Sequence, residues 1–377
     1  MSKAIDQLKE RLFRAWLSWQ TRPVAVRRYL AKKKIEPGGT LEEVDLERVR
    51  VAAVQMRLQP FKRALDYVDL IYQHVAGAVA EGAQLIVFPE YNATHLLGCL
   101  PGFEEMASGG SLEEALGEME GDISPADIFR FVGPATKALY EETYAHLARA
   151  FDVYIHAGSA VLPVGGGRLY NTAYLFGPDG KVLGRQHKLH LTPDEESWGM
   201  CVADGVTVIE TPLGNVGIPV CMDITYFETF RILTALGADI VLVPSADNDT
   251  FSLWKKMRGI WPRVQESPVY GVHSCMVGSF AGWEFSGFTG IFAPRALTPD
   301  DSGVLVRVSQ TAGEGMALGD VNISALRRYR GNEGDWRDYL NTDLIGAYLP
   351  DLYQRKDLRV AEEATDTDRK VDSSGGS

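Results

Sequence analysis

The stretch Gly217-Ile218-Pro219-Val220-Cys221-Met222-Asp223 decides how this chain is interpreted, because it brings a cysteine to the end of an apolar strand. We expect the chain to turn into a helix there, where backbone N–H groups and the positive end of the helix dipole favour a thiolate. A lone cysteine is more often a small buried hydrophobic residue than a nucleophile. The interpretation of Cys221 therefore depends on which other reactive side chains reach similar places.

Two further strand ends carry reactive side chains. Leu85–Phe88 is a short apolar run that stops at a proline and presents the carboxylate of Glu90. A predicted strand at 181–188 ends on Lys188 and runs into an acidic turn. In α/β folds, sites are built at the edge where strands give way to loops. We therefore expect a carboxylate, an amine and a thiol to meet at one edge of a sheet.

The composition excludes several classes of protein. The chain has 377 residues, 45% of them hydrophobic, which is enough for a large core and for one to three domains. It contains no apolar run of the ~18 residues that span a bilayer, and we identify no signal-peptide pattern. The net charge of −12 disfavours non-specific nucleic-acid binding. A cytoplasmic protein with reduced thiols is expected from the wide spacing of Cys99, Cys201, Cys221 and Cys275.

Residues 1–48 are expected to form a basic, amphipathic helical extension in front of an α/β body. Residues 1–35 hold ten Lys and Arg against two acidic residues, a net charge of +8, so the remainder carries about −20. Apolar side chains recur there at helical spacing, namely Ile5, Leu8, Leu12, Trp16 and Trp19. Two interpretations are open: peripheral contact with an anionic membrane through residues 1–35, or packing on the chain's own domain or a partner subunit. We favour packing.

Periodicity predicts alternating strands and helices after the turn Pro37-Gly38-Gly39. We expect strands at 51–56, 85–88, 153–162, 169–177, 181–188, 206–211, 216–221 and 239–243. Helices are expected at 62–81, 134–150 and 226–237, the last ending at a left-handed glycine. Hairpins mixed with βα units imply a sheet that is only partly parallel. Residues 103–133 have weak periodicity and are expected to form a long loop that could contain one short helix, either at the rim of the site or without a role in recognition.

At the three reactive strand ends the sequence resembles the nitrilase superfamily of carbon–nitrogen hydrolases. That family carries F-P-E, a lysine at a strand end and a G-x-x-x-C-x-D elbow, and these occur here at Glu90, Lys188 and Cys221. The resemblance runs from about Val51 to Arg330. It implies an α/β fold, a four-layer αββα sandwich formed by a carbon–nitrogen hydrolase domain at 49–330.

The resemblance also implies a mechanism. Cys221 would attack the carbonyl carbon, while Glu90 would accept the thiol proton and later return one to the departing nitrogen. Lys188 and the backbone N–H of Met222 would stabilise the oxyanion. The expected substrate is a small-molecule amide, and no cofactor is required.

Further residues near the motifs complete the candidate site. Many relatives have a second glutamate that orients the substrate or assists the base. Counting from neighbouring motifs leaves Glu195 and Glu196 open for this role, with a slight preference for Glu195. Tyr226 and Trp198 are near enough in sequence to line the pocket, although core packing explains them equally well. Asp223 is expected to brace the cysteine turn through hydrogen bonds, as comparable acids do in relatives.

The two residues after Cys221 indicate which class of carbon–nitrogen bond the enzyme would cleave. True nitrilases generally have Trp-Glu there, whereas Met222-Asp223 resembles the amidase and carbamoylase branches. We therefore expect a thiol hydrolase of linear amides or N-carbamoyl compounds. The alternatives are a nitrilase acting on a nitrile, an inactive interaction scaffold, or an unrelated enzyme with a Schiff base at Lys188. No metal is expected, because His187 and His190 lie three apart on a strand and point to opposite faces.

The remaining expectations concern assembly and the C-terminal part of the chain. Relatives commonly pair their sandwiches, so the resemblance implies a homo-oligomer, a dimer or larger. Residues 331–354 contain enough Trp, Tyr and Leu to serve as a packing arm. Residues 355–377 are charged and rich in Ser and Gly, which predicts a disordered tail.

Overall fold

The computed structural model describes residues 2–38, 44–101, 103, 124–248, 251–253, 258–280, 282–331 and 341–354. The chain divides into two units, residues 1–328 and 329–377, each of which is described by itself. Within the described ranges, no helix has the length and apolar character needed to cross a membrane.

The first unit contains two mixed sheets. The first sheet has the strand order β5 (Val182–His187), β4 (Arg168–Phe176), β3 (Tyr154–Val164), β2 (Leu85–Val87), β1 (Val49–Arg57) and β13 (Gly315–Val321). Its central strands β1, β2 and β3 are parallel, and its outer strands pair in antiparallel fashion. This mixture confirms the expectation of a partly parallel sheet.

The second sheet is joined to the first at one corner. Its strands are β6 (Val208–Ile209), β7 (Val216–Gly217), β8 (Ile240–Ser245), β9 (Tyr270–Phe280), β11 (Gly290–Phe292) and β12 (Val304–Arg307). β10 (Trp283–Phe285) forms a hairpin with the end of β9. The end of β1 pairs in parallel with β9 through Met56 and Arg57, so the two sheets form one nearly closed surface.

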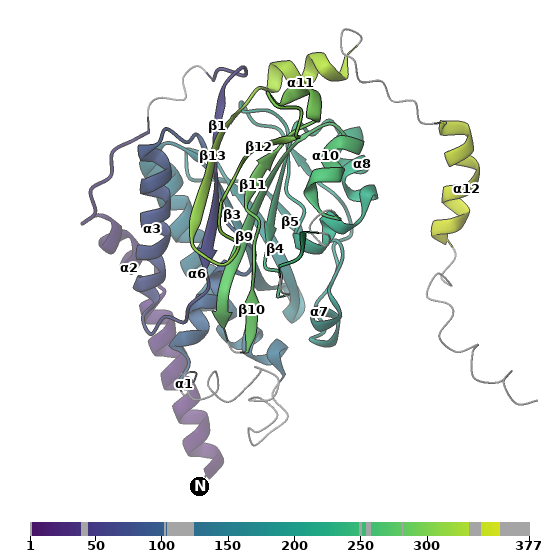
Figure 1. Ribbon diagram of the computed structural model, residues 1–377. Coiled ribbons are helices and arrows are strands. Elements are labelled where there is room, and N and C mark those ends of the chain that lie inside the picture. The colour runs from purple at the N-terminus through teal and green to yellow at the C-terminus, as the bar shows by residue number, and fades with distance from the viewer. Residues whose placement is uncertain are drawn as a thin grey trace, which may run out of the picture. The chain divides into compact units, whose positions relative to one another are not determined.

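Alternating side chains on the strands build three apolar layers. Val51 and Ala53 of β1 face the second sheet, whereas Ala52 and Val54 face α3 (Ala64–Ala80) and α6 (Pro125–Phe151). On the far side, the second sheet packs against α8 (Phe227–Ala235) and α10 (Ile260–Glu266). Figure 1 shows these two helix pairs on opposite sides of the strands. The order helix, sheet, sheet, helix confirms the four-layer αββα sandwich.

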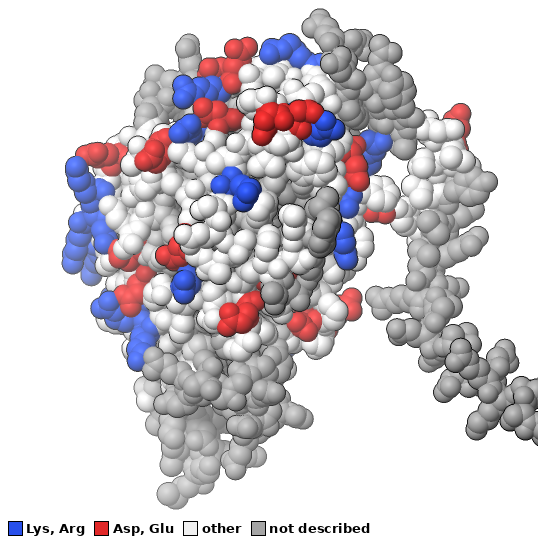
Figure 2. Space-filling view, viewed as in Figure 1, with Lys and Arg blue, Asp and Glu red and all other residues white. Residues whose placement is uncertain are grey.

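The N-terminal helices α1 (Ser2–Gln20) and α2 (Pro23–Leu30) pack on this body. Phe13 stacks on Phe131 of α6 with ring centroids 5.8 Å apart, and Leu17 and Leu30 are buried. The opposite face of α1 leaves Leu12, Trp16 and Trp19 exposed to solvent. Figure 2 shows Lys and Arg side chains along the edge where α2 lies in Figure 1, with acidic side chains beside them.

Several sequence expectations about secondary structure are wrong. The helix expected at 134–150 begins at Pro125, because Ser124 and Asp127 form a capping box that starts α6 nine residues earlier. The loop expected at 103–133 therefore ends before this helix, and residues 104–123 lie outside the described ranges. The strand expected at 216–221 pairs only over Val216–Gly217, because the N–H of Val220 donates to Asp223 instead of to a neighbouring strand.

The C-terminal part is only partly described. α11 (Ile323–Arg330) buries Ile323 and Leu326 in the core between the sheets. In the second unit, α12 (Thr342–Gln354) is amphipathic in sequence and carries an exposed Leu344 and Tyr353. The predicted packing role of residues 331–354 stays a prediction, and the predicted disorder of residues 355–377 concerns residues outside the described ranges.

Candidate active site

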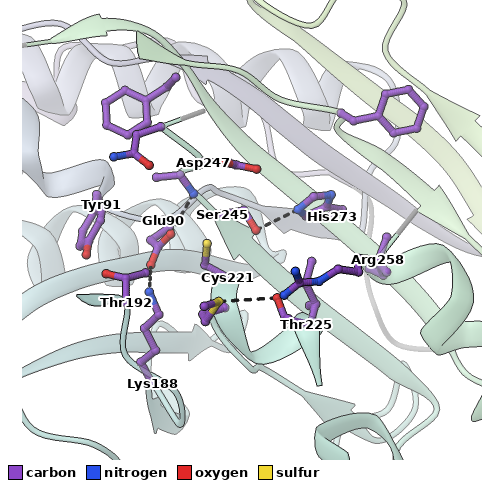
Figure 3. Close-up of a pocket in the computed structure, with 18 of the residues that line it drawn as sticks. Glu90, Tyr91, Lys188, Thr192, Cys221, Thr225, Ser245, Asp247, Arg258 and His273 are labelled. Atoms are coloured by element: carbon purple, nitrogen blue, oxygen red, sulfur yellow. Dashed lines mark hydrogen bonds and ion pairs between the residues drawn. The ribbon is translucent and has the colours of Figure 1, made fainter. Parts of the chain in front are cut away.

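A pocket of about 670 Å³ opens where the strands of both sheets end. Glu90 follows β2, Lys188 follows β5, and Cys221 lies four residues after the end of β7. All three line this pocket, and Figure 3 shows their side chains converging from separate segments. The structure thus brings together the carboxylate, the amine and the thiol that lie far apart in the sequence.

The centre of the site is a buried cluster of one cation and two carboxylates. Lys188 Nζ lies 2.9 Å from Glu90 Oε1 and 2.8 Å from Glu195 Oε2, and none of the three side chains is more than 1% exposed. Burying such charges is costly unless their partners are fixed close by. The cluster therefore depends on the surrounding fold to hold the three side chains in register.

The two carboxylates also accept hydrogen bonds from neutral donors. The backbone N–H of Ala246, just after β8, donates to Glu90 Oε2 over 2.8 Å. Asn171 on β4 donates its amide to both carboxylates, over 2.8 Å to Glu90 and 3.0 Å to Glu195. The hydroxyl of Tyr91 donates to Glu195 as well. These donors compensate for the loss of water around the carboxylates.

The structure distinguishes the two adjacent glutamates. The short helix α7 (Pro193–Ser197) begins with a capping box in which Thr192 and Glu195 bond each other's backbone N–H groups. This turn directs Glu195 inward to Lys188, and Glu196 is exposed at the surface of the same helix. Of the two candidates, Glu195 is the one beside the lysine.

The surroundings shift the pKa of each of four groups, namely Glu90, Glu195, Lys188 and Cys221. Burial raises the pKa of Glu90, although the charge of Lys188 opposes this. For Glu195, burial also acts upward, but Lys188 outweighs it and the pKa is lowered. Burial would lower the pKa of Lys188, yet the neighbouring acidic groups raise it. Burial and then Glu90 raise the pKa of the Cys221 thiol. Of the two carboxylates, Glu90 is therefore the better proton acceptor.

Cys221 occupies an unusual backbone conformation. Its φ of +42° lies in the left-handed region, which non-glycine residues seldom adopt. It opens a 3₁₀ turn, η3 (Cys221–Thr225), that separates it from α8. The expected direct passage from strand to helix is therefore wrong. The sharp turn presents the thiol to the pocket, and strained backbone of this kind is typical of functional positions.

Asp223 holds this turn against the segment that carries the lysine. It is fully buried and accepts from the N–H of Val220 over 2.8 Å and from the N–H of His190 over 2.8 Å. The N–H of Leu189 and the ring of His190 also contact its carboxylate. One side chain thus fixes the position of Cys221 relative to Lys188, which is the bracing role expected of it.

Not all of the other candidate residues lie in the pocket. Met222 and Trp198 line the pocket, and Trp198 is buried against Trp283 with ring centroids 5.7 Å apart. Tyr226 does not line the pocket; it is 41% exposed and packs on His190. Tyr226 is only five residues after Cys221 in the sequence. Its backbone is extended between η3 and α8, so its side chain does not reach the pocket.

His187 and His190 have separate partners. His187 bonds Thr172 over 2.9 Å and stacks on Tyr170, whereas His190 faces Asp223. Among the described residues, no group of three or more His, Cys, Asp or Glu is arranged to hold a metal ion.

Sequence reasoning missed several polar residues of the pocket. Tyr91, Asn171 and Ala246 contact the carboxylates, and Arg258 lines the opposite wall. Asn171 lies in the strand predicted at 169–177, and a polar amide within this largely apolar strand was the available signal. A backbone N–H such as that of Ala246 leaves no signal in a sequence.

Comparison with known proteins relates the chain to one family. The sequence profile of the carbon-nitrogen hydrolases matches residues 50–330. The probable hydrolase YhcX of Bacillus subtilis is 28% identical over 289 residues, which are 75% of this chain and 52% of that protein. A deaminated glutathione amidase of Synechocystis is 33% identical over 139 residues, 31% of this chain and 51% of that protein. The chain therefore spans about half the length of these curated relatives.

Solved structures share the fold. An amidase from Nesterenkonia sp. superposes with a TM-score of 0.56 and 20% identity, over 81% of this chain and 98% of that chain. A mutant of that amidase shows covalent addition of the acetamide moiety of fluoroacetamide at its active-site cysteine.

Proposed function

The chain belongs to the carbon-nitrogen hydrolase family, within the nitrilase superfamily, and on this premise we propose that it hydrolyses a linear amide or N-carbamoyl compound through a cysteine acyl-enzyme. The observation that carries the proposal is the placement of Cys221, Glu90 and Lys188 on one pocket, with the lysine held between Glu90 and Glu195.

In the proposed first half-reaction, the Cys221 sulfur forms a bond to the carbonyl carbon while its proton passes to Glu90. Lys188 and the backbone N–H of Met222 stabilise the negative charge on the former carbonyl oxygen. The carbon–nitrogen bond then breaks as Glu90 returns the proton to the departing nitrogen. This step releases ammonia or an amine and leaves a thioester on Cys221.

The second half-reaction consumes one water molecule. Glu90 removes a proton from the water, which adds to the thioester, and the carbon–sulfur bond breaks with the proton returning to the sulfur. The products are a carboxylic acid and the free thiol. Its raised pKa suits Glu90 to accept and donate a proton in turn, and the lowered pKa of Glu195 suits it to keep Lys188 cationic and in place.

An amide is preferred to a nitrile on two grounds. Met222-Asp223 follows the cysteine where nitrilases generally have Trp-Glu. The deaminated glutathione amidase of Synechocystis is a relative whose name refers to an amide substrate.

Intact-protein mass spectrometry against a panel of amides, N-carbamoyl amines and nitriles tests this proposal. We expect an acyl adduct on the wild-type protein, and a loss of turnover by ~10⁴-fold or more in Cys221→Ala. Cys201→Ala is the matched control, because Cys201 is also partly exposed but does not line the pocket. Full turnover in Cys221→Ala would exclude the thiol mechanism and favour a Schiff base at Lys188.

A further inference from the structure

Aromatic side chains make up much of the pocket wall. They come from α10, β10, β11 and the segment between these two strands, and include Trp261, Trp283, Phe285, Phe288 and Phe292. Such a wall suits the apolar body of a small substrate. A charged side chain on this wall therefore indicates which charge the substrate has away from its amide group. The catalytic cluster does not indicate this.

Arg258 supplies such a charge. It lines the pocket just before α10, and Figure 3 shows its guanidinium extending into the pocket toward Thr225, at the end of the turn that begins with Cys221. Among the residues that the structure describes, no carboxylate forms an ion pair with Arg258. The other cation of the lining, Lys188, is held by two carboxylates.

The remaining charges of the lining lie elsewhere. Asp194 is exposed on α7, and Figure 3 places Asp247 on the same side as Ser245, away from the guanidinium. Thr225 Oγ1 is directed to the sulfur of Met222 over 3.6 Å. Among the described residues of the lining, neither of these carboxylates lies beside the head of Arg258, which is an exposed side chain. A planar guanidinium in such a place matches a carboxylate, which it can bind through two parallel hydrogen bonds.

We propose that Arg258 is a specificity-determining residue that selects amides whose far end carries a carboxylate. This inference rests on the proposed function, because it takes Cys221 as the site of attack on the amide. The aromatic wall would hold the chain between the two ends. Because Arg258 is exposed, an uncharged end would leave the guanidinium hydrated and would forgo the paired, charge-assisted hydrogen bonds, so it would bind less tightly.

Binding is measured first, in the Cys221→Ala background, so that the result does not depend on turnover. The probes are linear primary amides with two to four methylene groups that end either in a carboxylate or in a nitro group. The nitro group has the same planar shape and no net charge. We expect the carboxylate to bind about 10- to 100-fold more tightly than the nitro compound at low salt. Added salt should reduce this preference.

Variants of Arg258 then identify the source of the preference. Arg258→Met should abolish it, and Arg258→Lys should retain part of it, because lysine keeps the charge and loses the paired donors. The matched control is Arg185→Met, since Arg185 is exposed on β5 and does not line this pocket. Equal binding of both probes to the Cys221→Ala protein, or a preference that survives in Arg258→Met, would overturn the inference.

Turnover by the otherwise wild-type protein separates this inference from the proposed function. Carboxylate-selective binding without hydrolysis of any amide supports the role of Arg258 and contradicts the proposed reaction. Hydrolysis of carboxylate and nitro amides at equal kcat/KM supports the reaction and contradicts the role of Arg258.

Discussion

The catalytic cluster and the N-terminal segment both contain ion pairs of lysine with glutamate, but the first are buried and the second is exposed to water. Lys188 and its two carboxylate partners are at most 1% exposed, whereas the side chains of Lys34 and Glu36 are 84% and 76% exposed. Water and salt screen an exposed pair, so it contributes little. In the cluster, removal of water makes each charge depend on its partners and shifts their pKa values. The pKa shifts that suit the catalytic groups to their proposed roles therefore arise where the fold excludes solvent.

The two regions are also held in place by different interactions. Hydrogen bonds donated by Asn171 and Ala246, and those accepted by Asp223, fix the catalytic groups. The N-terminal helices attach chiefly through apolar side chains such as Phe13, Leu17 and Leu30. Substitutions should therefore affect activity in the first region and stability alone in the second.

The largest effect is expected from Lys188→Met. It leaves Glu90 and Glu195 facing each other without their shared cation, and removing one partner of a buried pair costs about 3–5 kcal/mol. Amide hydrolysis should fall by ~10³-fold, because the oxyanion loses its cation. Denaturant unfolding and a hydrolysis assay measure the two effects. Lys34→Met is the control, and both quantities should stay at wild-type values. Equal effects of the two substitutions would contradict the conclusion that the buried ion pairs matter and the exposed pair does not.

Asp223→Asn should have the next largest effect. An amide can keep part of the four contacts that the carboxylate accepts, but its NH₂ end meets backbone N–H groups. We expect a loss of about 2 kcal/mol in stability and a roughly 10- to 100-fold fall in kcat, because Cys221 shifts relative to Lys188. In Asp45→Asn, which alters an exposed carboxylate that accepts from Glu47, neither should change. Wild-type kcat in Asp223→Asn would argue against the bracing role.

The pH dependence of kcat/KM should show the raised pKa of Glu90. Glu90 accepts a proton only when ionised, so activity should decline about tenfold per pH unit below that pKa. Because burial raises the pKa, the decline should begin above pH 4.5, the value of an ordinary glutamate. A pH–rate profile from pH 4 to 8 measures this. A limb at or below pH 4.5 would be inconsistent with a desolvated base.

The smallest effect concerns the N-terminal helix and compares two leucines on its opposite faces. Leu17 is 5% exposed and Leu12 is 63% exposed. Leu17→Ala should lower stability by about 2 kcal/mol with kcat unchanged, because it removes buried contacts. Leu12→Ala should stay within about 0.5 kcal/mol of wild type. Thermal unfolding of both variants measures this. Equal losses would indicate that the exposed face is covered in solution by another surface, such as a second copy or a membrane.

Much of the fold could be predicted because its signals are local. The apolar runs that became β1, β3 and β8 are continuous in the sequence, and the glycine that ends α8 adopts the expected left-handed conformation at Gly237. The start of α6 was missed by nine residues, and the helix continues through Pro134. The true signal was the capping pair Ser124 and Asp127.

The sequence places Glu90, Lys188 and Cys221 at three strand ends, which gather at one edge of a sheet, and the resemblance to the nitrilase superfamily implies their roles. Only the tertiary structure decided that Glu195 rather than Glu196 faces Lys188, since neighbouring residues on a short turn have no periodicity to distinguish them. It also decided the contacts of Asn171, Ala246 and Arg258, and the pKa shifts. These depend on distances between segments and on the exclusion of water, which no local pattern of residues encodes.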